Sequence, residues 1–206
     1  MNAAVITETR QFNPQIIRDH LSMLPSDFEL IVFCADRNLR LFNEFDCIKY
    51  KVVVNNLHDY NRLLTSVWFW EKLIDYDRVL IFQTDSKILR KGIEEYYYYD
   101  YLGAPWKFQD KCGNGGLSLR NPKVMYEMVS TLNYTGNPYE DVWFSNNIEK
   151  FGNLAPREVC KKFSCETIFE LGTWGYHAIE SYMTKDQIEK IENQYNGKEI
   201  KENYGI

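Results

Sequence analysis

Short hydrophobic runs alternate with amphipathic stretches along the first hundred residues. Four runs are apolar enough for buried strands: 3–7, 28–35, 48–54 and 79–82. Asn13 and Pro14, after the first run, are typical of a helix start. A longer helix is predicted over 61–75, where one stripe holds Leu63, Val67, Trp70 and Ile74. Because strands alternate with helices, we expect an α/β fold with helices on both faces of a central sheet.

The second half of the chain is less regular. Its glycines concentrate at 113–116, which predicts a tight turn rather than a strand or helix. The other expected elements are a short strand over 117–119, a helix from Pro122, a helix from Pro138 to about Gly152, a strand over 167–171 and a polar helix from about Thr184. The alternation of the first half therefore gives way to a different arrangement.

Composition and charge narrow the kind of protein. The 206 residues are 45% hydrophobic and carry a formal net charge of −5, which suits one globular domain and gives no basic surface for a nucleic-acid backbone. No apolar stretch approaches the ~20 residues of a membrane span, and residues 1–9 lack the pattern of a secretory signal. The five cysteines form an odd set without a CxxC pair, so we expect reduced packing residues. These features predict a cytoplasmic protein with no membrane span and no nucleic-acid partner.

Three carboxylates are candidates for a functional role because of their positions in the predicted elements. Asp85 follows the run at 79–82, and ligands of α/β sheets bind beyond the carboxyl ends of the strands. Asp85 either binds a hard divalent cation or caps the next turn. Glu140 has the spacing of a capping box with Asn137, which favours a structural role. Asp141 shares a helical stripe with apolar positions, and a place in the first turn favours the ionised form that a general base needs.

A glycine segment and one histidine complete the candidates. Residues 113–116 allow close approach of the backbone to a ligand, but no Lys-Ser or Lys-Thr pair follows, which argues against an ordinary nucleotide triphosphatase. His177 follows a stretch rich in glycine and aromatic residues, where an imidazole could reach a metal, although a lone histidine is more often not a ligand. His20 and His58 are expected to be structural or solvated.

The order of these motifs resembles the GT-A class of glycosyltransferases over residues 3–183. The pieces are a β/α half ending in Gln83-Thr84-Asp85, the segment Gly115-Gly116-Leu117-Ser118-Leu119-Arg120, the pair Glu140-Asp141 and a late His177. In particular, the chain is similar to the small GT-A domains with which large algal DNA viruses glycosylate their capsid protein. The resemblance implies one catalytic domain over 1–183, with a nucleotide-binding half over about 1–100 and an acceptor and metal half over 101–183. Residues 184–206 would form a polar helix and tail, or a linker to further domains of a longer chain.

The resemblance also implies roles for individual residues. Where the class has an Asp-x-Asp motif, this sequence has Gln83-Thr84-Asp85, so Asp85 and His177 would hold Mn²⁺ or Mg²⁺. Asp141, beside Glu140, would take the proton of the acceptor hydroxyl or face the reacting sugar. The residues expected to bind the sugar nucleotide are Thr7, Thr9, Arg10, Asp36, Arg62, Gln83, Thr84, Asp85, Asn114, Gly115 and Gly116.

These roles predict a glycosyltransferase that moves a sugar from a nucleoside-diphosphate sugar, taken to be a UDP-sugar, to a hydroxyl of a glycan or glycoprotein. A viral protein of this kind would work in the host cytoplasm. Two other functions fit the same residues. One is a metal-dependent nucleotide-sugar hydrolase or phosphoesterase, in which similar groups activate water. The other is a carbohydrate-binding domain with a decayed catalytic site, which the incomplete Asp-x-Asp motif suggests.

Overall fold

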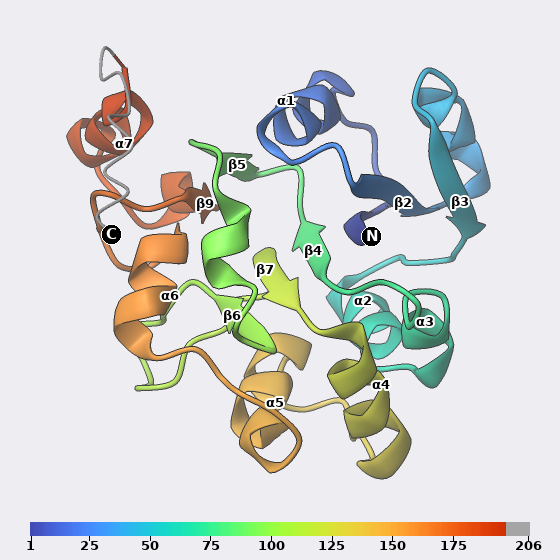
Figure 1. Ribbon diagram of the computed structural model, residues 1–206. Coiled ribbons are helices and arrows are strands. Elements are labelled where there is room, and N and C mark those ends of the chain that lie inside the picture. Colours follow the sequence, from blue (N-terminus) through green and yellow to red (C-terminus); the bar gives the residue numbers. More distant parts are fainter. Residues whose placement is uncertain (197–206) are drawn as a thin grey trace.

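Two β-sheets organise residues 1–196, which are the part of the chain that the computed structural model describes (Figure 1). The larger sheet has six strands in the order β3-β2-β1-β4-β7-β6. Their bounds are Asn2–Glu8 for β1, Phe28–Cys34 for β2, Cys47–Lys51 for β3, Val79–Phe82 for β4, Tyr101–Gly103 for β6 and Leu117–Arg120 for β7. The strands expected from the apolar runs of the first half are therefore confirmed, with the third ending earlier than expected.

The direction of the strands changes between the two halves of the chain. β1 is parallel to β2 and β4, and β2 is parallel to β3. β7 is antiparallel to both of its neighbours, β4 and β6. The sheet is therefore mixed, and the carboxyl ends of β1 to β4 lie along one edge, where α/β proteins bind their ligands.

The smaller sheet brings together three segments that are distant in the sequence. β9 (Gly175–His177) lies between β5 (Ser86–Ile88), to which it is antiparallel, and β8 (Ser164–Cys165), to which it is parallel. The expected strand over 167–171 is wrong, because the short β9 pairs with residues 164 and 165 instead. The 167–171 segment forms bends and irregular structure, and Leu171 is 48% exposed.

Helices cover both faces of the larger sheet, as expected. Their bounds are Gln15–Met23 for α1, Leu57–Leu64 for α2, Val67–Glu71 for α3, Pro122–Thr131 for α4, Glu140–Asn147 for α5, Arg157–Phe163 for α6 and Lys185–Asn193 for α7, with 3₁₀ turns at Asp36–Phe42, Ile93–Tyr96, Ile148–Lys150 and Ile179–Ser181. Leu80 and Phe82 of β4 pack in one core with α1 and α6, whereas Val79 and Ile81 pack in a second core with α2 to α5. Alternate side chains of one strand thus serve two buried layers.

Polar contacts divide the helix that the periodicity predicts over 61–75. The structure has two helices here, α2 and α3, separated at Thr65 and Ser66. The Ser66 hydroxyl donates to the carbonyl of Leu63 (2.7 Å) and accepts from the amide of Phe69 (3.2 Å), so Ser66 caps α3 instead of continuing α2. The apolar stripe persists across the break, which is why periodicity alone predicts one helix.

The helix expected from Pro138 begins two residues later. The Asn137–Pro138 peptide bond is cis, and α5 runs from Glu140 to Asn147. The amide of Glu140 donates to Oδ1 of Asn61 on α2 (2.8 Å), so a side chain from another helix satisfies it. The capping box between Asn137 and Glu140 is therefore wrong, and the Glu140 carboxylate is free for a different partner.

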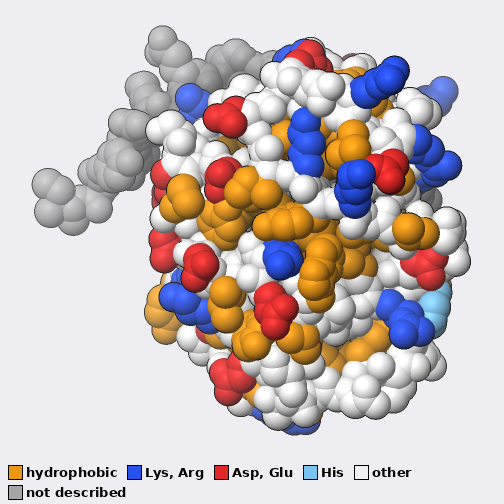
Figure 2. All heavy atoms as spheres, turned by 90° about the vertical axis from the view of Figure 1, so that its right-hand side faces the viewer, with side chains coloured by type: hydrophobic (Ala, Val, Ile, Leu, Met, Phe, Trp, Pro, Cys, Tyr) orange, Lys and Arg blue, Asp and Glu red, His pale blue; other side chains and the backbone are white. Residues whose placement is uncertain are grey.

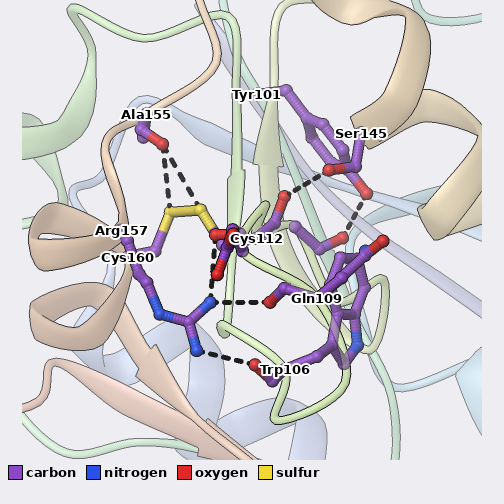
Figure 3. The surroundings of a disulfide bond; sticks show 10 residues. Tyr101, Trp106, Gln109, Cys112, Ser145, Ala155, Arg157 and Cys160 are labelled. Atoms are coloured by element: carbon purple, nitrogen blue, oxygen red, sulfur yellow. Dashed lines mark hydrogen bonds between the residues drawn. A yellow bond between two sulfur atoms is a disulfide. The ribbon is translucent and has the colours of Figure 1, made fainter.

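A disulfide joins Cys112 and Cys160, so the expectation that all five cysteines are reduced is wrong for this pair (Figure 3). Cys34, Cys47 and Cys165 are free. The two bonded cysteines are 48 residues apart in sequence and meet because the loop before the glycine segment packs beside α6. The Ser145 hydroxyl donates to the carbonyl of Cys112 (2.7 Å), which ties the same loop to α5. The glycine segment is therefore held at its start by two helices.

The polar helix expected from Thr184 is α7, and Thr184 caps it through a capping box with Gln187. The end of the expected tail, 197–206, lies outside the described residues. Within residues 1–196, none of the helices combines the length and the apolar character that crossing a bilayer needs.

Candidate active site

Hollows follow the carboxyl ends of the parallel strands. A cavity of ≈ 260 Å³ has walls formed by Thr7, Glu8, Thr9 and Arg10 at the end of β1, by residues 54–57 at the start of α2, and by Tyr60 and Gln83. A second cavity, of ≈ 180 Å³, is lined by the glycine segment, by residues 139–141 and by His177. Leu57, Tyr60 and Gln83 line both cavities. The two hollows therefore adjoin and form one cleft across the end of β4.

A third hollow extends the cleft toward the outer strands. It measures ≈ 430 Å³, includes Asp36, and shares Thr9, Val54 and Asn55 with the first cavity. Two adjoining hollows thus contain four of the residues expected to bind the sugar nucleotide: Thr7, Thr9, Arg10 and Asp36. Figure 2 shows the side of the molecule that carries β3, α2 and α3, where hydrophobic side chains gather in the middle of the surface. Val53 and Leu57 are exposed apolar residues that also line these hollows, so the cleft opens beside apolar surface.

Glu8 is a site residue that the sequence analysis missed. Its side chain is only 4% exposed, and its two oxygens accept from Nε and NH2 of Arg10 at 3.0 and 2.8 Å. The hydroxyl of Thr84 also donates to Glu8, at 3.4 Å. Glu8 therefore fixes Arg10 at the mouth of the cleft and links the ends of β1 and β4. A carboxylate at the end of a buried strand is the signal that could have identified it.

Asp85 and His177 contact each other beyond the end of β4: His177 lines the second cavity, whereas Asp85 lines a separate hollow of ≈ 230 Å³ together with Thr84. The Nε2 atom of His177 lies 3.3 Å from Oδ1 of Asp85 and 3.1 Å from Oε1 of Gln83. The side chain of Asp85 is 54% exposed and that of His177 only 11%, so the carboxylate is open to solvent whereas the imidazole is largely buried. Antiparallel pairing of Ser86 with His177 places the two residues side by side.

The charges of this pair reinforce each other. Burial lowers the pKa of His177, but the carboxylates of Asp85 and Glu166 outweigh that effect and raise it to about 9. The hydrogen bond with His177 in turn lowers the pKa of Asp85. At neutral pH an ionised Asp85 therefore lies beside a protonated imidazole, and a cation that binds Nε2 of His177 must displace the proton from that nitrogen.

Asp85 and His177 fit a divalent cation as an oxygen and a nitrogen donor facing one another. Within residues 1–196, no three His, Cys, Asp or Glu side chains gather into a ready-made metal cage. His177 stands between Asp85 and Glu166 and turns a different ring nitrogen to each, so these three do not face one point. A cation of the Mg²⁺ type needs only one or two protein ligands when substrate phosphates supply the rest. Two donors are therefore compatible with a cation that binds together with a phosphate-bearing substrate.

The glycine segment and Asp141 form the other end of the cleft. The amide of Gly115 donates to Oδ2 of Asp141 (3.1 Å), and the amide of Val142 donates to Oδ1 (2.7 Å). Burial, with the neighbouring charge of Glu140 in second place, raises the pKa of Asp141 to about 7. Asp141 therefore changes charge near neutral pH, as an efficient acid or base does, whereas the helix-dipole argument predicts a carboxylate that stays ionised.

The need for glycine in this segment is visible at two positions. A Cβ atom on Gly116 would overlap the ring of His177, and one on Gly115 would overlap the carboxylate of Glu140. Asn114 donates from Nδ2 to Glu166 (3.0 Å) and accepts from the amide of Gly116 (3.1 Å). The segment thus packs directly against His177 on one side and against Glu140 on the other. Only residues without side chains allow this approach.

Glu140 forms a buried ion pair with Arg120. Arg120 is 0% exposed, and its NH1 and NH2 atoms donate to Oε2 and Oε1 of Glu140 at 3.0 and 3.2 Å. The guanidinium also lies over the rings of Trp70, Tyr101 and Phe144, with 4.9 Å to the centroid of Tyr101. Glu140 thus pairs with a buried cation and lines the second cavity beside Asp141, and its expected share in the catalytic role stays a prediction.

Arg62 and two of the histidines lie outside the cleft. Arg62 lines a separate hollow of ≈ 330 Å³ together with His58, so the structure does not bring it to the other expected donor residues. His20 is buried and bonded to the carbonyl of Ile16 and the hydroxyl of Ser86, and burial lowers its pKa to about 4. His20 is therefore structural, as expected, and His58 lies at the surface.

The fold is similar to that of a solved glycosyltransferase. The apo form of the glycosyltransferase GlyE from Streptococcus pneumoniae TIGR4 has a TM-score of 0.52 and 13% identity, over 90% of this chain and 55% of that chain. TarS 1-349 from S. aureus has a TM-score of 0.46 and 15% identity, over 74% of this chain and 56% of that chain. The likeness to GlyE shows a GT-A-like fold. The chain spans about half the length of that protein.

Sequence comparison identifies the family. No curated protein matches the chain. Residues 43–178 match the family described as protein of unknown function (DUF5672). The matched stretch contains Asp85, the glycine segment, Asp141 and His177. Every residue that lines the second cavity therefore lies within it. Because this match covers most of the chain, the protein belongs to the DUF5672 family.

Proposed function

We propose that the protein transfers a sugar from a nucleoside-diphosphate sugar, a UDP-sugar in the first instance, to a hydroxyl of a glycan or glycoprotein. The observation that carries this proposal is the 3.3 Å contact of Asp85 with His177 beside two adjoining hollows, one of which His177 lines. One hollow, at the end of β1, suits a nucleoside; the other, at the glycine segment, suits a sugar. A diphosphate between them would lie at the Asp85–His177 pair.

The charges in the cleft suit the departure of a nucleoside diphosphate. A Mn²⁺ or Mg²⁺ ion held by Asp85 and His177 would supply positive charge where the leaving group becomes more negative. Arg10, held by Glu8, provides a further positive charge at the mouth of the same cavity. In a protein of net charge −5, this local compensation is needed for an anionic substrate to bind.

Asp141 is the group of this chain that we assign to the acceptor hydroxyl. Its pKa of about 7 allows it to be ionised in a large fraction of molecules and still accept a proton at neutral pH. The bond from Gly115 fixes one carboxylate oxygen against the glycine segment. Deprotonation of the hydroxyl by Asp141 would promote its attack on the sugar, an effect worth about 10²–10⁴ in rate for a general base.

The proposal also covers the domain bounds, the acceptor and the cellular location that the resemblance implies. Residues 1–183 would form the catalytic domain, with about 1–100 binding the nucleotide and 101–183 the acceptor and metal. A capsid glycoprotein is one acceptor to test beside simple glycans, and the cytoplasm, of the host if the protein is viral, is the expected location. The disulfide between Cys112 and Cys160 argues for an oxidising compartment instead, because such bonds are rare in the reducing cytosol.

The direct test is titration calorimetry of UDP and several UDP-sugars, with and without Mn²⁺. We expect binding that Mn²⁺ strengthens, and we expect Asp85→Ala to weaken it by at least about 10–100-fold, the loss that follows even from removing a residue that only supports a metal ligand. Asp186→Ala is the matched control, because that carboxylate is 75% exposed and pairs with Lys190 on α7. Donor binding that is equal in Asp85→Ala and in the unchanged protein would refute the role of Asp85.

Product analysis separates transfer from hydrolysis. The protein would be incubated with a bound donor and with candidate acceptors, and glycosylated product would be measured beside free sugar. Formation of product at the expense of free sugar is expected. Release of free sugar at the same rate with every acceptor would instead identify a nucleotide-sugar hydrolase.

A further inference from the structure

Glu166 is a buried carboxylate with no role in the proposed reaction as described so far. It follows β8 and is 6% exposed. A buried charge without partners costs several kcal/mol, so the groups around it show what it does. The Oε1 atom of Glu166 lies 3.2 Å from Nδ1 of His177 and accepts a hydrogen bond of 3.0 Å from Nδ2 of Asn114. One oxygen therefore contacts both the histidine of the cleft and the glycine segment.

The smaller sheet explains this meeting. Ser164 and Cys165 of β8 lie opposite Gly175 and Tyr176 of β9, so Glu166, the first residue after β8, comes beside His177. On the other side of β9, Ser86 lies opposite His177, and Asp85 precedes it. Asp85, His177 and Glu166 thus form a row across three strands, with the imidazole in the middle.

We propose that Glu166 is a positioning residue, which orients the imidazole of His177 toward a divalent cation and fixes the glycine segment against it. This inference rests on the proposed function. Nε2 of His177 faces Asp85 and Gln83, while Nδ1 is buried and faces Glu166. Metal-binding histidines commonly turn their second nitrogen to a carboxylate in this way, and loss of that partner typically lowers metal affinity about 10–100-fold.

The contact between Nδ1 and Glu166 is close but is not aligned as a hydrogen bond, and Nδ1 has no other hydrogen-bond partner within the described residues. A small rotation of the ring toward the carboxylate would give this buried nitrogen a hydrogen bond with Glu166. Such a rotation also moves Nε2, the atom that faces Asp85. The orientation of the donor atom is therefore tied to Glu166 and not to Asp85 alone.

The same carboxylate reaches the sugar end of the cleft through Asn114. Asn114 donates to Glu166 and accepts from the amide of Gly116, and the space above Gly116 is filled by the His177 ring. Glu166, Asn114, Gly116 and His177 form a closed set of contacts. A change at Glu166 should therefore alter both the cation site and the backbone of the glycine segment. A residue that contacts only one of the two would alter only that one.

The experiment compares Glu166→Gln with the unchanged protein and with Glu158→Gln, whose carboxylate is 78% exposed and pairs with Lys161 on α6. Binding of Mn²⁺ would be measured by titration calorimetry in the presence of saturating UDP, whose phosphates supply the remaining ligands, and the amide signal of Gly116 would be followed by two-dimensional NMR without metal. We expect Glu166→Gln to weaken Mn²⁺ binding about 10–100-fold and to shift the Gly116 signal. Glu158→Gln should change neither.

Each outcome decides the proposal. A folded Glu166→Gln variant with unchanged Mn²⁺ affinity would overturn it, even if its melting temperature fell, because a merely structural residue lowers stability without changing the affinity of folded molecules. If Glu166→Gln does not fold, Glu166→Asp decides, because it keeps the charge but shortens its reach; unchanged affinity there would also overturn the proposal. Absence of Mn²⁺ binding by the unchanged protein would instead refute the cation role of Asp85 and His177, so the two failures are distinguishable.

Discussion

The buried pair between Arg120 and Glu140 offers a sharp test of how the site is supported. Glu140→Gln keeps the shape of the side chain but removes the charge that neutralises Arg120, a guanidinium with no exposed surface. Removing one partner of a buried pair typically costs about 3–5 kcal/mol, because the other charge stays in the interior without compensation. For a chain of this size, that loss lowers the melting temperature by roughly 6–20 °C.

The assay is thermal and urea unfolding followed by circular dichroism. Glu158→Gln removes a carboxylate from an exposed pair and should leave the free energy of unfolding almost unchanged. Replacing both partners with apolar residues, as Arg120→Met with Glu140→Leu, should cost less than either single change, because no buried charge is then left alone. The rings of Trp70, Tyr101 and Phe144 can pack against the new side chains.

The reasoning would be refuted if Glu140→Gln lost less than about 1 kcal/mol, the value typical of surface pairs. It would also fail if the double change were as costly as the two single changes together. Either result would mean that water solvates Arg120, or that another residue compensates its charge, when Glu140 is changed. The buried pair would then not be what supports Asp141.

Three further predictions concern the cleft and the loop that holds it. Gly116→Ala should abolish most Mn²⁺-dependent donor binding, because the new methyl group would overlap the ring of His177; calorimetry with binding equal to that of the unchanged protein would contradict this. The transfer rate should rise with pH through an apparent pKa of about 7, because Asp141 acts as a base only after losing its proton; a rate–pH profile that is flat between pH 5.5 and 8.5, on the order of one and a half units either side of that value, would exclude this role. In denatured, unreduced protein a thiol reagent should label three cysteines, and five after reduction, because Cys112 and Cys160 are bonded; five labelled thiols before reduction would show that the bond is absent.

Local sequence patterns determined the order and type of most elements. The apolar runs that became β1, β2 and β4 are continuous because each strand is buried on both faces, and that burial is visible in the sequence. Asn121 with Pro122, and Thr184 with Gln187, are local capping signals, and both mark real helix starts. The late histidine and the aspartate after β4 were identified as candidates from the order of motifs.

Only the tertiary structure decided which side chains meet. The local sequence favours the amide of Asn137 as the partner of Glu140, whereas the fold supplies Arg120. Cys112 and Cys160 had no spacing that predicts a bond, yet the packing of a loop on α6 brings them together. Glu166 carried no motif at all and gains its contacts through the pairing of β8 with β9. Periodicity and capping depend on neighbours within a few residues, whereas these contacts depend on long-range strand pairing and on the cost of leaving a buried charge alone, which no local pattern records.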